Sequence, residues 1–353
     1  MNNPLLMESP YPYGAPQFDK IENKHYLPAF ETAINEAKVE IDGIVSNPEA
    51  PDFHNTIEAL EFSGKSLSRI SEIFYNILEA DSDDELQDIA EKISPMMNDY
   101  SMYVALNEEL FMRVKTVYDN PGQDLAPDQK RLLENTYRSF ARQGAFLKGA
   151  GKEEYSKCME ELSLLTLRFG KNVLDATNAY ELNIIDPDNL AGMPEYVKDA
   201  GRKTAEDRGQ DGWTYTLDRP SYGPFMQYCA NPELRRQMYM AYNTRAVENN
   251  SEIVRRIAEL RLRVANLLGY ETWADYVLEE NMAKNTDTVQ SFLEELMVPS
   301  LPFARKEVSV LYDYAKSHGF EETASKFGLP ADRLMPWDFS FWAEKYKSEK
   351  YEL

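Results

Sequence analysis

Histidine and cysteine are scarce in this sequence of 353 residues, which contains three histidines and two cysteines. His25, His54 and His318 lie far apart and none precedes a glutamate, so no helix carries a pair of histidines one turn apart for a metal ion. Cys158 and Cys229 form no CxxC pair, which excludes a local thiolate metal site or redox centre. We expect two free thiols in the core, and one disulfide between them is the alternative.

The short motifs of common enzyme classes are also absent. The sequence has no GxSxG nucleophile elbow, no P-loop and no GxGxxG. The densest acidic run, 81–85, lacks the glycine and terminal glutamate spacing of a calcium loop, and acids at the start of a helix explain it better. We therefore predict no catalytic, cofactor-binding or metal-ligating residue in this chain, and its substrate-binding residues stay unknown.

Basic residues are outnumbered by acidic ones. The sequence has 38 basic and 60 acidic residues, and its net charge is −22. This balance argues against nucleic acid or an anionic membrane as a partner, because both require a basic surface. One group of arginines stands out, and we interpret it as a solvated helix face interleaved with glutamates: Arg235, Arg236, Arg255, Arg256, Arg261 and Arg263.

Long apolar runs are missing as well. No stretch reaches the roughly 18 apolar residues of a membrane span. The N-terminus is rich in proline and has no basic-then-apolar signal pattern, so the sequence predicts a cytoplasmic protein. A periplasmic or exported location is the alternative if a signal segment has been removed.

Helical periodicity dominates what is present. In the central stretch, Asn231-Pro232-Glu233 is a strong helix start, and Leu234, Met238 and Tyr242 then share one face. A second helix begins after residues 249–251 and is ended by Gly269. We expect Pro95 to kink or break one helix, and Pro299 and Pro302 to bend another. Further helices are predicted over 25–46, 57–78, 85–118, 127–142, 153–177, 194–208, 272–280, 287–317, 320–327 and 339–351.

The periodicity changes between residues 180 and 217. Residues 180–185 and 213–217 read as strands on either side of the polar helix at 194–208. The fold class is therefore mainly α, with a small strand–helix–strand insert. We divide the chain into an extended arm (1–24), pinned to the body by Tyr11, Tyr13 and Phe18, a helical region (25–179), the insert (180–217) and a second helical region (218–353).

Long phrases of the sequence resemble a known family. These are NPLLMESPYPYGAPQFDKIENKHYLPAFETAI near the start, LSLLTLRFGKNVLDATNAYEL, PSYGPFMQYCANPELRRQMYMAYNTRA, IVRRIAELRLRVANLLGYETWADYVLEENMAKN and LMPWDFSFWAEKYK. They are similar to the zinc oligopeptidases related to thimet oligopeptidase and oligopeptidase A, and the opening looks most like the peptidyl-dipeptidase (dipeptidyl carboxypeptidase) branch. The resemblance spans nearly the whole chain.

The resemblance implies a helical protein with two lobes around a channel and a zinc ion held through an HExxH motif. That motif is absent here, so we expect the N-terminal portion of such an enzyme, truncated before its zinc-binding catalytic part. The last helix, which runs to Glu352-Leu353 without a stop signal, supports the same expectation.

The implied partners are short unstructured peptides and the missing catalytic portion. The full-length enzyme is expected to bind zinc and to release dipeptides from peptide C-termini, whereas this chain alone is expected to bind no zinc and to be inactive. The alternatives are an endo-acting oligopeptidase of the same family and a stand-alone helical module that binds peptides.

Overall fold

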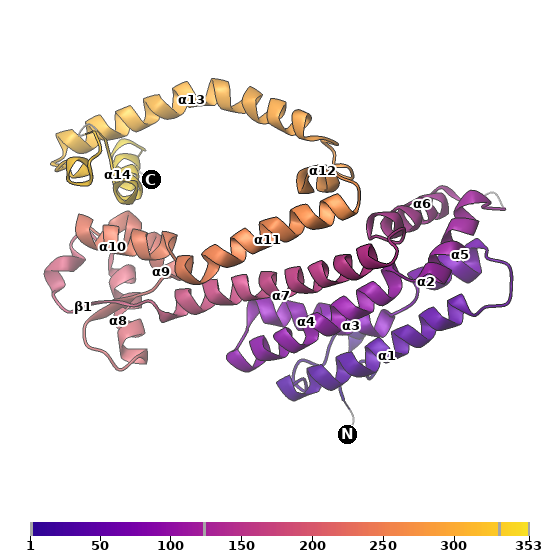
Figure 1. Ribbon diagram of the computed structural model, residues 1–353. Helices are drawn as coiled ribbons and strands as arrows, with labels where there is room; N and C mark the ends of the chain where they lie inside the picture. The colour runs from indigo at the N-terminus through magenta and orange to yellow at the C-terminus, as the bar shows by residue number, and fades with distance from the viewer. Residues whose placement is uncertain (1–2, 123–124, 331–332, 352–353) are drawn as a thin grey trace. The chain divides into compact units, whose positions relative to one another are not determined.

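The computed structural model describes residues 3–122, 125–330 and 333–351, and helices make up most of it (Figure 1). The chain forms two compact units. Unit 1 comprises residues 1–169 and 253–277, and unit 2 comprises residues 170–252 and 278–353. The chain passes between the units within two long helices, α7 (Ala150–Ala179) and α11 (Val247–Leu267), and at the end of α12 (Trp273–Leu278). The division of the chain predicted from the sequence stays a prediction.

Unit 1 is helical throughout its described part. Its α1 packs against α3, α4 and α5, and two buried clusters fill the space between these helices. The helices of its first 142 residues, in chain order, are η1 (Pro12–Gly14), η2 (Asn23–His25), α1 (Tyr26–Val45), η3 (Phe53–Glu58), α2 (Ala59–Glu61), α3 (Lys65–Ala80), α4 (Asp84–Ala105), α5 (Glu108–Asp119) and α6 (Pro127–Arg142).

Local signals explain where several of these helices begin. The Asp83 side chain accepts a hydrogen bond from the backbone N–H of Leu86 and caps α4, so the acidic run lies at a helix N-terminus as predicted. Asp52, rather than the predicted Asn55, caps η3. Of the two outcomes expected at Pro95, the break is wrong, because α4 continues through it, and the kink stays a prediction. Helix α13 also continues through Pro299 and Pro302, as expected of prolines that bend a helix without ending it.

The N-terminal arm is held by a residue that the sequence analysis did not select. Tyr11, Tyr13 and Phe18 are 39%, 108% and 55% exposed, so the prediction that they pin the arm is wrong. Leu5 is buried in the core between α1, α3 and α4 instead, and Arg69 donates hydrogen bonds to the carbonyls of Leu5 and Met7. A single aliphatic side chain fits this narrow site, whereas the ring of Tyr13 lies in solvent.

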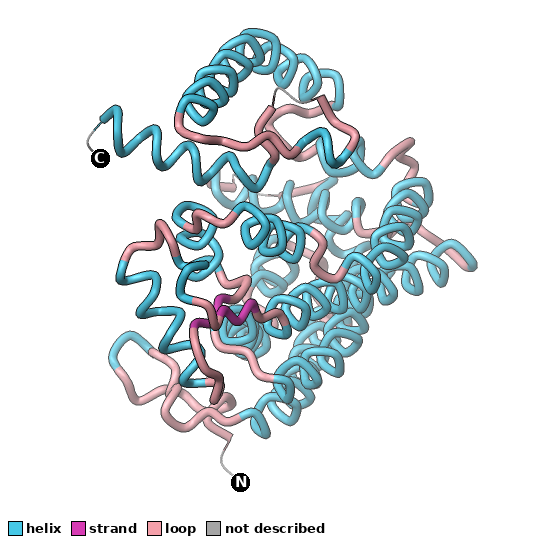
Figure 2. Tube along the Cα trace, turned by 90° about the vertical axis from the view of Figure 1, so that its left-hand side faces the viewer, coloured by secondary structure: helices cyan, strands magenta, loops and turns pink. Residues whose placement is uncertain are grey.

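Unit 2 contains the sheet of the described structure, a pair of short antiparallel strands (magenta in Figure 2). Its elements are β1 (Leu182–Ile184), η4 (Pro187–Leu190), α8 (Glu195–Asp207), β2 (Trp213–Tyr215), α9 (Arg219–Tyr228), α10 (Pro232–Asn243), α13 (Thr286–Ser317), η5 (Ala324–Phe327) and α14 (Pro336–Tyr351). The mainly α fold and the strand–helix–strand insert are thus confirmed.

The insert is closed by an antiparallel pairing of β1 and β2, in which Ile184 faces Trp213 and Leu182 faces Tyr215. Gly212 precedes β2 with φ +82°, and a Cβ there would lie 2.3 Å from the carbonyl oxygen of Ile184. Glycine is required at this position both by the left-handed backbone and by the close approach of β1.

Two expectations for the last third of the chain need correction. The last helix was predicted over 339–351, but α14 begins at Pro336, whose fixed φ suits the first helical position. The predicted helix over 320–327 shrinks to η5. The end of the last helix, at Glu352 and Leu353, lies outside the described residues.

Candidate functional site

Each histidine forms a hydrogen bond with a residue close to it in the sequence. His25 Nδ1 accepts from the backbone N–H of Glu22 at 3.0 Å, and His54 Nδ1 lies 2.8 Å from Glu58 Oε2. The Glu58 carboxylate raises the pKa of His54. His318 follows α13, where its Nδ1 lies 2.8 Å from the carbonyl oxygen of Tyr314. His54 thus lies near the start of η3, and His318 lies at the end of α13.

These positions do not fit a zinc site. No group of three or more His, Cys, Asp or Glu residues with the arrangement of a metal site occurs among the described residues. A zinc ion in a protein takes three or four such ligands, so no step of zinc chemistry can be assigned to the residues of this chain.

Both cysteines are free and buried, which confirms the expectation of two core thiols. Burial raises the pKa of Cys229 to about 11 and also raises that of Cys158. A reactive cysteine requires a thiolate near neutral pH, so neither residue has the environment of a nucleophile.

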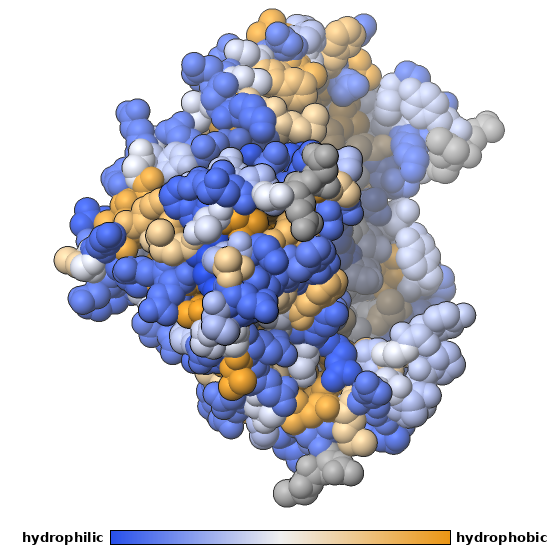
Figure 3. Space-filling model, turned by 90° about the vertical axis from the view of Figure 1, so that its right-hand side faces the viewer, coloured by the Kyte–Doolittle hydropathy of each residue, from blue (hydrophilic) through white to orange (hydrophobic). Residues whose placement is uncertain are grey.

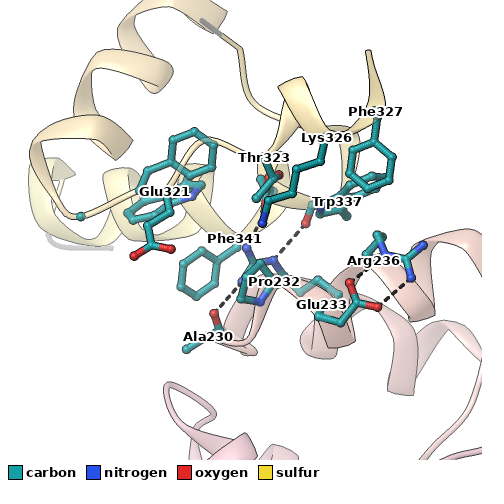
Figure 4. Close-up of a pocket in the computed structure, with 15 residues that line it drawn as sticks. Ala230, Pro232, Glu233, Arg236, Glu321, Thr323, Lys326, Phe327, Trp337 and Phe341 are labelled. Atoms are coloured by element: carbon teal, nitrogen blue, oxygen red, sulfur yellow. Dashed lines mark hydrogen bonds and ion pairs between the residues drawn. The ribbon is translucent and has the colours of Figure 1, made fainter. Parts of the chain in front are cut away.

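Unit 2 contains a cavity of about 370 Å³ between α10, η5 and α14 (Figure 4). Aromatic rings form much of its wall, and charged side chains stand at its rim. Its lining residues are Ala230, Pro232, Glu233, Arg235, Arg236, Gly319, Phe320, Glu321, Thr323, Lys326, Phe327, Trp337, Asp338, Phe341 and Trp342.

Arg235 lies in the wall of this cavity and is almost completely buried, with 2% of its side chain exposed. Its Nη2 donates to Asp338 Oδ1 at 2.6 Å, and its Nε donates to the carbonyl oxygen of Trp337 at 3.1 Å. Its Nη1 donates to the carbonyl oxygens of Cys229 and Ala230. One guanidinium thus fixes the start of α14 to the segment that precedes α10.

This burial corrects the interpretation of Arg235 as part of a solvated face. The sequence did contain a signal for this burial. Arg235 lies three residues before Met238 and seven before Tyr242, so it shares the apolar face of the helix with them. Arg236, one position on, points to the rim and donates to both carboxylate oxygens of Glu233 at 2.8 and 2.7 Å (Figure 4).

The arginines of α11 match the predicted solvated face. Arg256 donates to both carboxylate oxygens of Glu161 at 2.6 and 2.7 Å, and Arg263 pairs with Glu154. Arg255 pairs with Glu259 on the same helix. All six side chains of these pairs are partly or largely exposed, so they make no basic surface that could hold a polyanion.

The chemistry available in the cavity is binding rather than bond breaking. Its lining contains no histidine, cysteine or serine, and Asp338 is already paired with Arg235. Burial raises the pKa of Asp338 while the neighbouring Arg235 opposes that shift. Aromatic walls with charges of both signs at the rim suit a peptide-like or aromatic group.

No helix in the part of the chain that the structure describes is long and apolar enough to span a membrane.

Comparison with known proteins gives consistent matches. Residues 225–353 match the model of peptidase family M3. Oligopeptidase A from Salmonella typhimurium is 32% identical over 362 aligned positions, which cover the whole chain and 51% of the relative. Dipeptidyl carboxypeptidase from Escherichia coli is 33% identical over 357 positions, which cover 99% of the chain and 51% of the relative.

The same pattern extends to plants, where a probable cytosolic oligopeptidase A from Arabidopsis thaliana is 29% identical over the whole chain and is covered to 50% of its length. The chain spans about half the length of the curated relatives it matches. The resemblance identified in the sequence is confirmed, since the chain is similar to peptidases of family M3.

Proposed function

We propose that this chain is the N-terminal half of a zinc metallopeptidase that hydrolyses short peptides and that it does not cleave peptides alone. The observation that carries the proposal is the extent of the similarity: the whole chain aligns with two peptidases, yet it covers 51% of each. The absence of a histidine–glutamate pair from the sequence agrees with a division in which the metal is bound elsewhere.

In this proposal the chain forms part of the wall that shapes access to the active site. The zinc ion, when bound by the other half, supplies a Lewis acid for attack of water on the peptide carbonyl. The residues of this chain select and hold the substrate. The buried Arg235–Asp338 pair, which joins α10 to α14, is one contact that would hold such a wall together.

We further propose that the enzyme releases dipeptides from the C-termini of short peptides in the cytoplasm. The support for this branch is the likeness of residues 3–34 to the opening of peptidyl-dipeptidases. Overall identity does not separate the branches, since it is 33% to dipeptidyl carboxypeptidase and 32% to oligopeptidase A. An endo-acting oligopeptidase is the alternative within the family.

A second function of another class is a stand-alone helical module that binds peptides without cleaving them. The cavity beside Arg235, with aromatic walls and charged side chains at its rim, favours this alternative.

The test is a cleavage assay with added zinc, run in parallel on this chain and on the product of the uncut gene. Products of a ten-residue peptide are identified by mass spectrometry, with and without a chelator. Chelator-sensitive release of C-terminal dipeptides by the longer product alone is the expected result. Internal cleavage would select the endo-acting alternative, and no cleavage by either protein would reject the peptidase proposal in favour of the binding module.

A further inference from the structure

Helix α13 exposes an unusual number of large apolar side chains. Between residues 292 and 310, nine of them are between 39% and 70% exposed: Phe292, Leu293, Leu296, Met297, Val298, Leu301, Phe303, Val308 and Val310. In the described part of α13 only Leu311 and Ala315 are buried, and they contact the aromatic cluster of α14. In Figure 1 only the C-terminal end of α13 lies beside α14, and Figure 3 shows orange apolar atoms at the surface at the height of α13.

The exposed side chains are ordered around the helix. At 3.6 residues per turn, Phe292, Leu296, Phe303 and Val310 form one stripe. A second stripe of Leu293, Met297 and Val308 runs into the buried Leu311 and Ala315. The two stripes together cover about half the circumference, whereas the helix of a globular surface usually has an apolar stripe about 100° wide. The charged side, with Glu294, Glu295 and Arg305, faces the other way.

Such a helix gains little from its own backbone. Pro299 and Pro302 each lack the N–H that would donate to the preceding turn. Long helices are stabilised mainly by packing of their apolar face. None of the first 25 residues of α13 is buried. A covering surface would therefore stabilise this helix strongly.

We infer that α13 is the docking surface for the polypeptide that continues beyond Leu353, the same half to which the proposed function assigns the zinc ion. The inference rests on that proposed function. The relatives have about as much chain again as this one covers, and the family match over 225–353 includes all of α13. A covalently continuous partner is also present at high effective concentration.

Charge argues against a second copy of this chain as the occupant. Each copy carries a net charge of −22, so two copies repel one another at close approach. Glu294, Glu295 and Arg305 lie away from the apolar stripes of α13, whereas Glu307 lies between the stripes and the exposed Val298 lies on the charged side. The stripes remain mostly apolar, which suits a contact of the kind that joins the halves of a protein.

The test uses the product of the uncut gene with a site for a specific protease inserted after Leu353. After cleavage, the two pieces are expected to remain together in size-exclusion chromatography. The double substitution Leu296→Glu and Phe303→Glu places two charges in one stripe and is expected to weaken association by at least about a hundredfold, because each replaces a large apolar side chain that the contact would bury. Ser309→Glu, on the charged side of the same helix, is the matched control and is expected to leave association unchanged.

A second measurement covers the case in which the doubly substituted full-length protein fails to fold. The chain of residues 1–353 is expected to bind the apolar dye ANS, and the double substitution is expected to reduce this signal while the far-UV spectrum stays helical. Pieces that remain together despite the double substitution would overturn the inference. A dimer of residues 1–353 that the same substitution dissolves, or a gene that ends at codon 353, would also overturn it. Association without peptide cleavage would reject the proposed function and leave the docking surface intact.

Discussion

Arg235 on α10 and Asp338 on α14, which are 103 positions apart in the chain, form an ion pair at 2.6 Å with 2% and 1% of their side chains exposed. The guanidinium also contacts the ring of Phe341, 4.2 Å from its centroid. The pair joins the helix with the clearest start signal in the sequence to a helix whose beginning the sequence did not reveal.

Replacing Arg235 by methionine is expected to destabilise unit 2 by about 3–5 kcal/mol, because a buried carboxylate then loses its partner. The free energy of unfolding can be measured in urea by tryptophan fluorescence, since Trp337 and Trp342 lie on α14. Arg236→Met is the control at the adjacent position. It removes an exposed pair with Glu233, and we expect a loss of about 1 kcal/mol or less. Equal losses for the two variants would contradict a structural role for the Arg235–Asp338 pair.

Gly212→Ala is expected to destabilise the insert by at least about 3 kcal/mol, because the new Cβ would meet the Ile184 carbonyl and the backbone is left-handed. Gly209→Ala is the matched control. Gly209 also has a positive φ, +67°, but has open space around its Cβ position, so a loss of about 1–2 kcal/mol is expected. Thermal unfolding of the two variants compares them, and a smaller loss for Gly212→Ala than for Gly209→Ala would count against the close approach of β1.

Leu5→Ala is expected to cost about 2–5 kcal/mol, since Leu5 fills a buried site in the core of unit 1. Limited proteolysis should then cut the arm faster. Tyr13→Ala, at a fully exposed ring, is expected to change neither stability nor cleavage rate. Protection of the arm that depends on Tyr13 and not on Leu5 would contradict this assignment.

Both thiols are expected to resist Ellman's reagent at pH 8 in the native protein and to react, two per chain, after unfolding. Burial raises the pKa of Cys229 from 9.0 to about 11, so the unfolded chain loses this proton at lower pH than the folded one. The contribution to stability is therefore complete below about pH 9 and is lost as the pH rises towards 11. A thiol that reacts within seconds in native buffer would show that this burial is incorrect.

His54 is expected to titrate above its ordinary pKa, because the Glu58 carboxylate favours the charged imidazole. Glu58→Gln should move the titration midpoint, followed by NMR of the ring protons, to lower pH. The pair stabilises the folded state at pH values below the ordinary pKa of histidine. This stabilisation is lost as the pH rises through the raised pKa of His54. Both residues are exposed, so the effect on stability is small. An unchanged midpoint in Glu58→Gln would exclude the pair in solution.

Local signals in the sequence were sufficient to predict features that depend on residues close together in the chain. Asn231 caps α10 by accepting from the backbone N–H groups of Glu233 and Leu234, as its position before Pro232 predicts. The strands of the insert and the acidic start of α4 also follow from neighbouring residues. The family resemblance indicated a class of enzyme through long phrases of sequence rather than through any single site.

The sequence by itself therefore determined the helical class, the insert and the missing metal motif. Only the tertiary structure decided which charged residue is buried, because the partner of Arg235 is 103 residues away. It also decided that Leu5 anchors the arm and that Arg263 pairs with Glu154 rather than with Glu259. Helical spacing tells which side chains share a face, but the surface that meets that face is set by chain folding over long range.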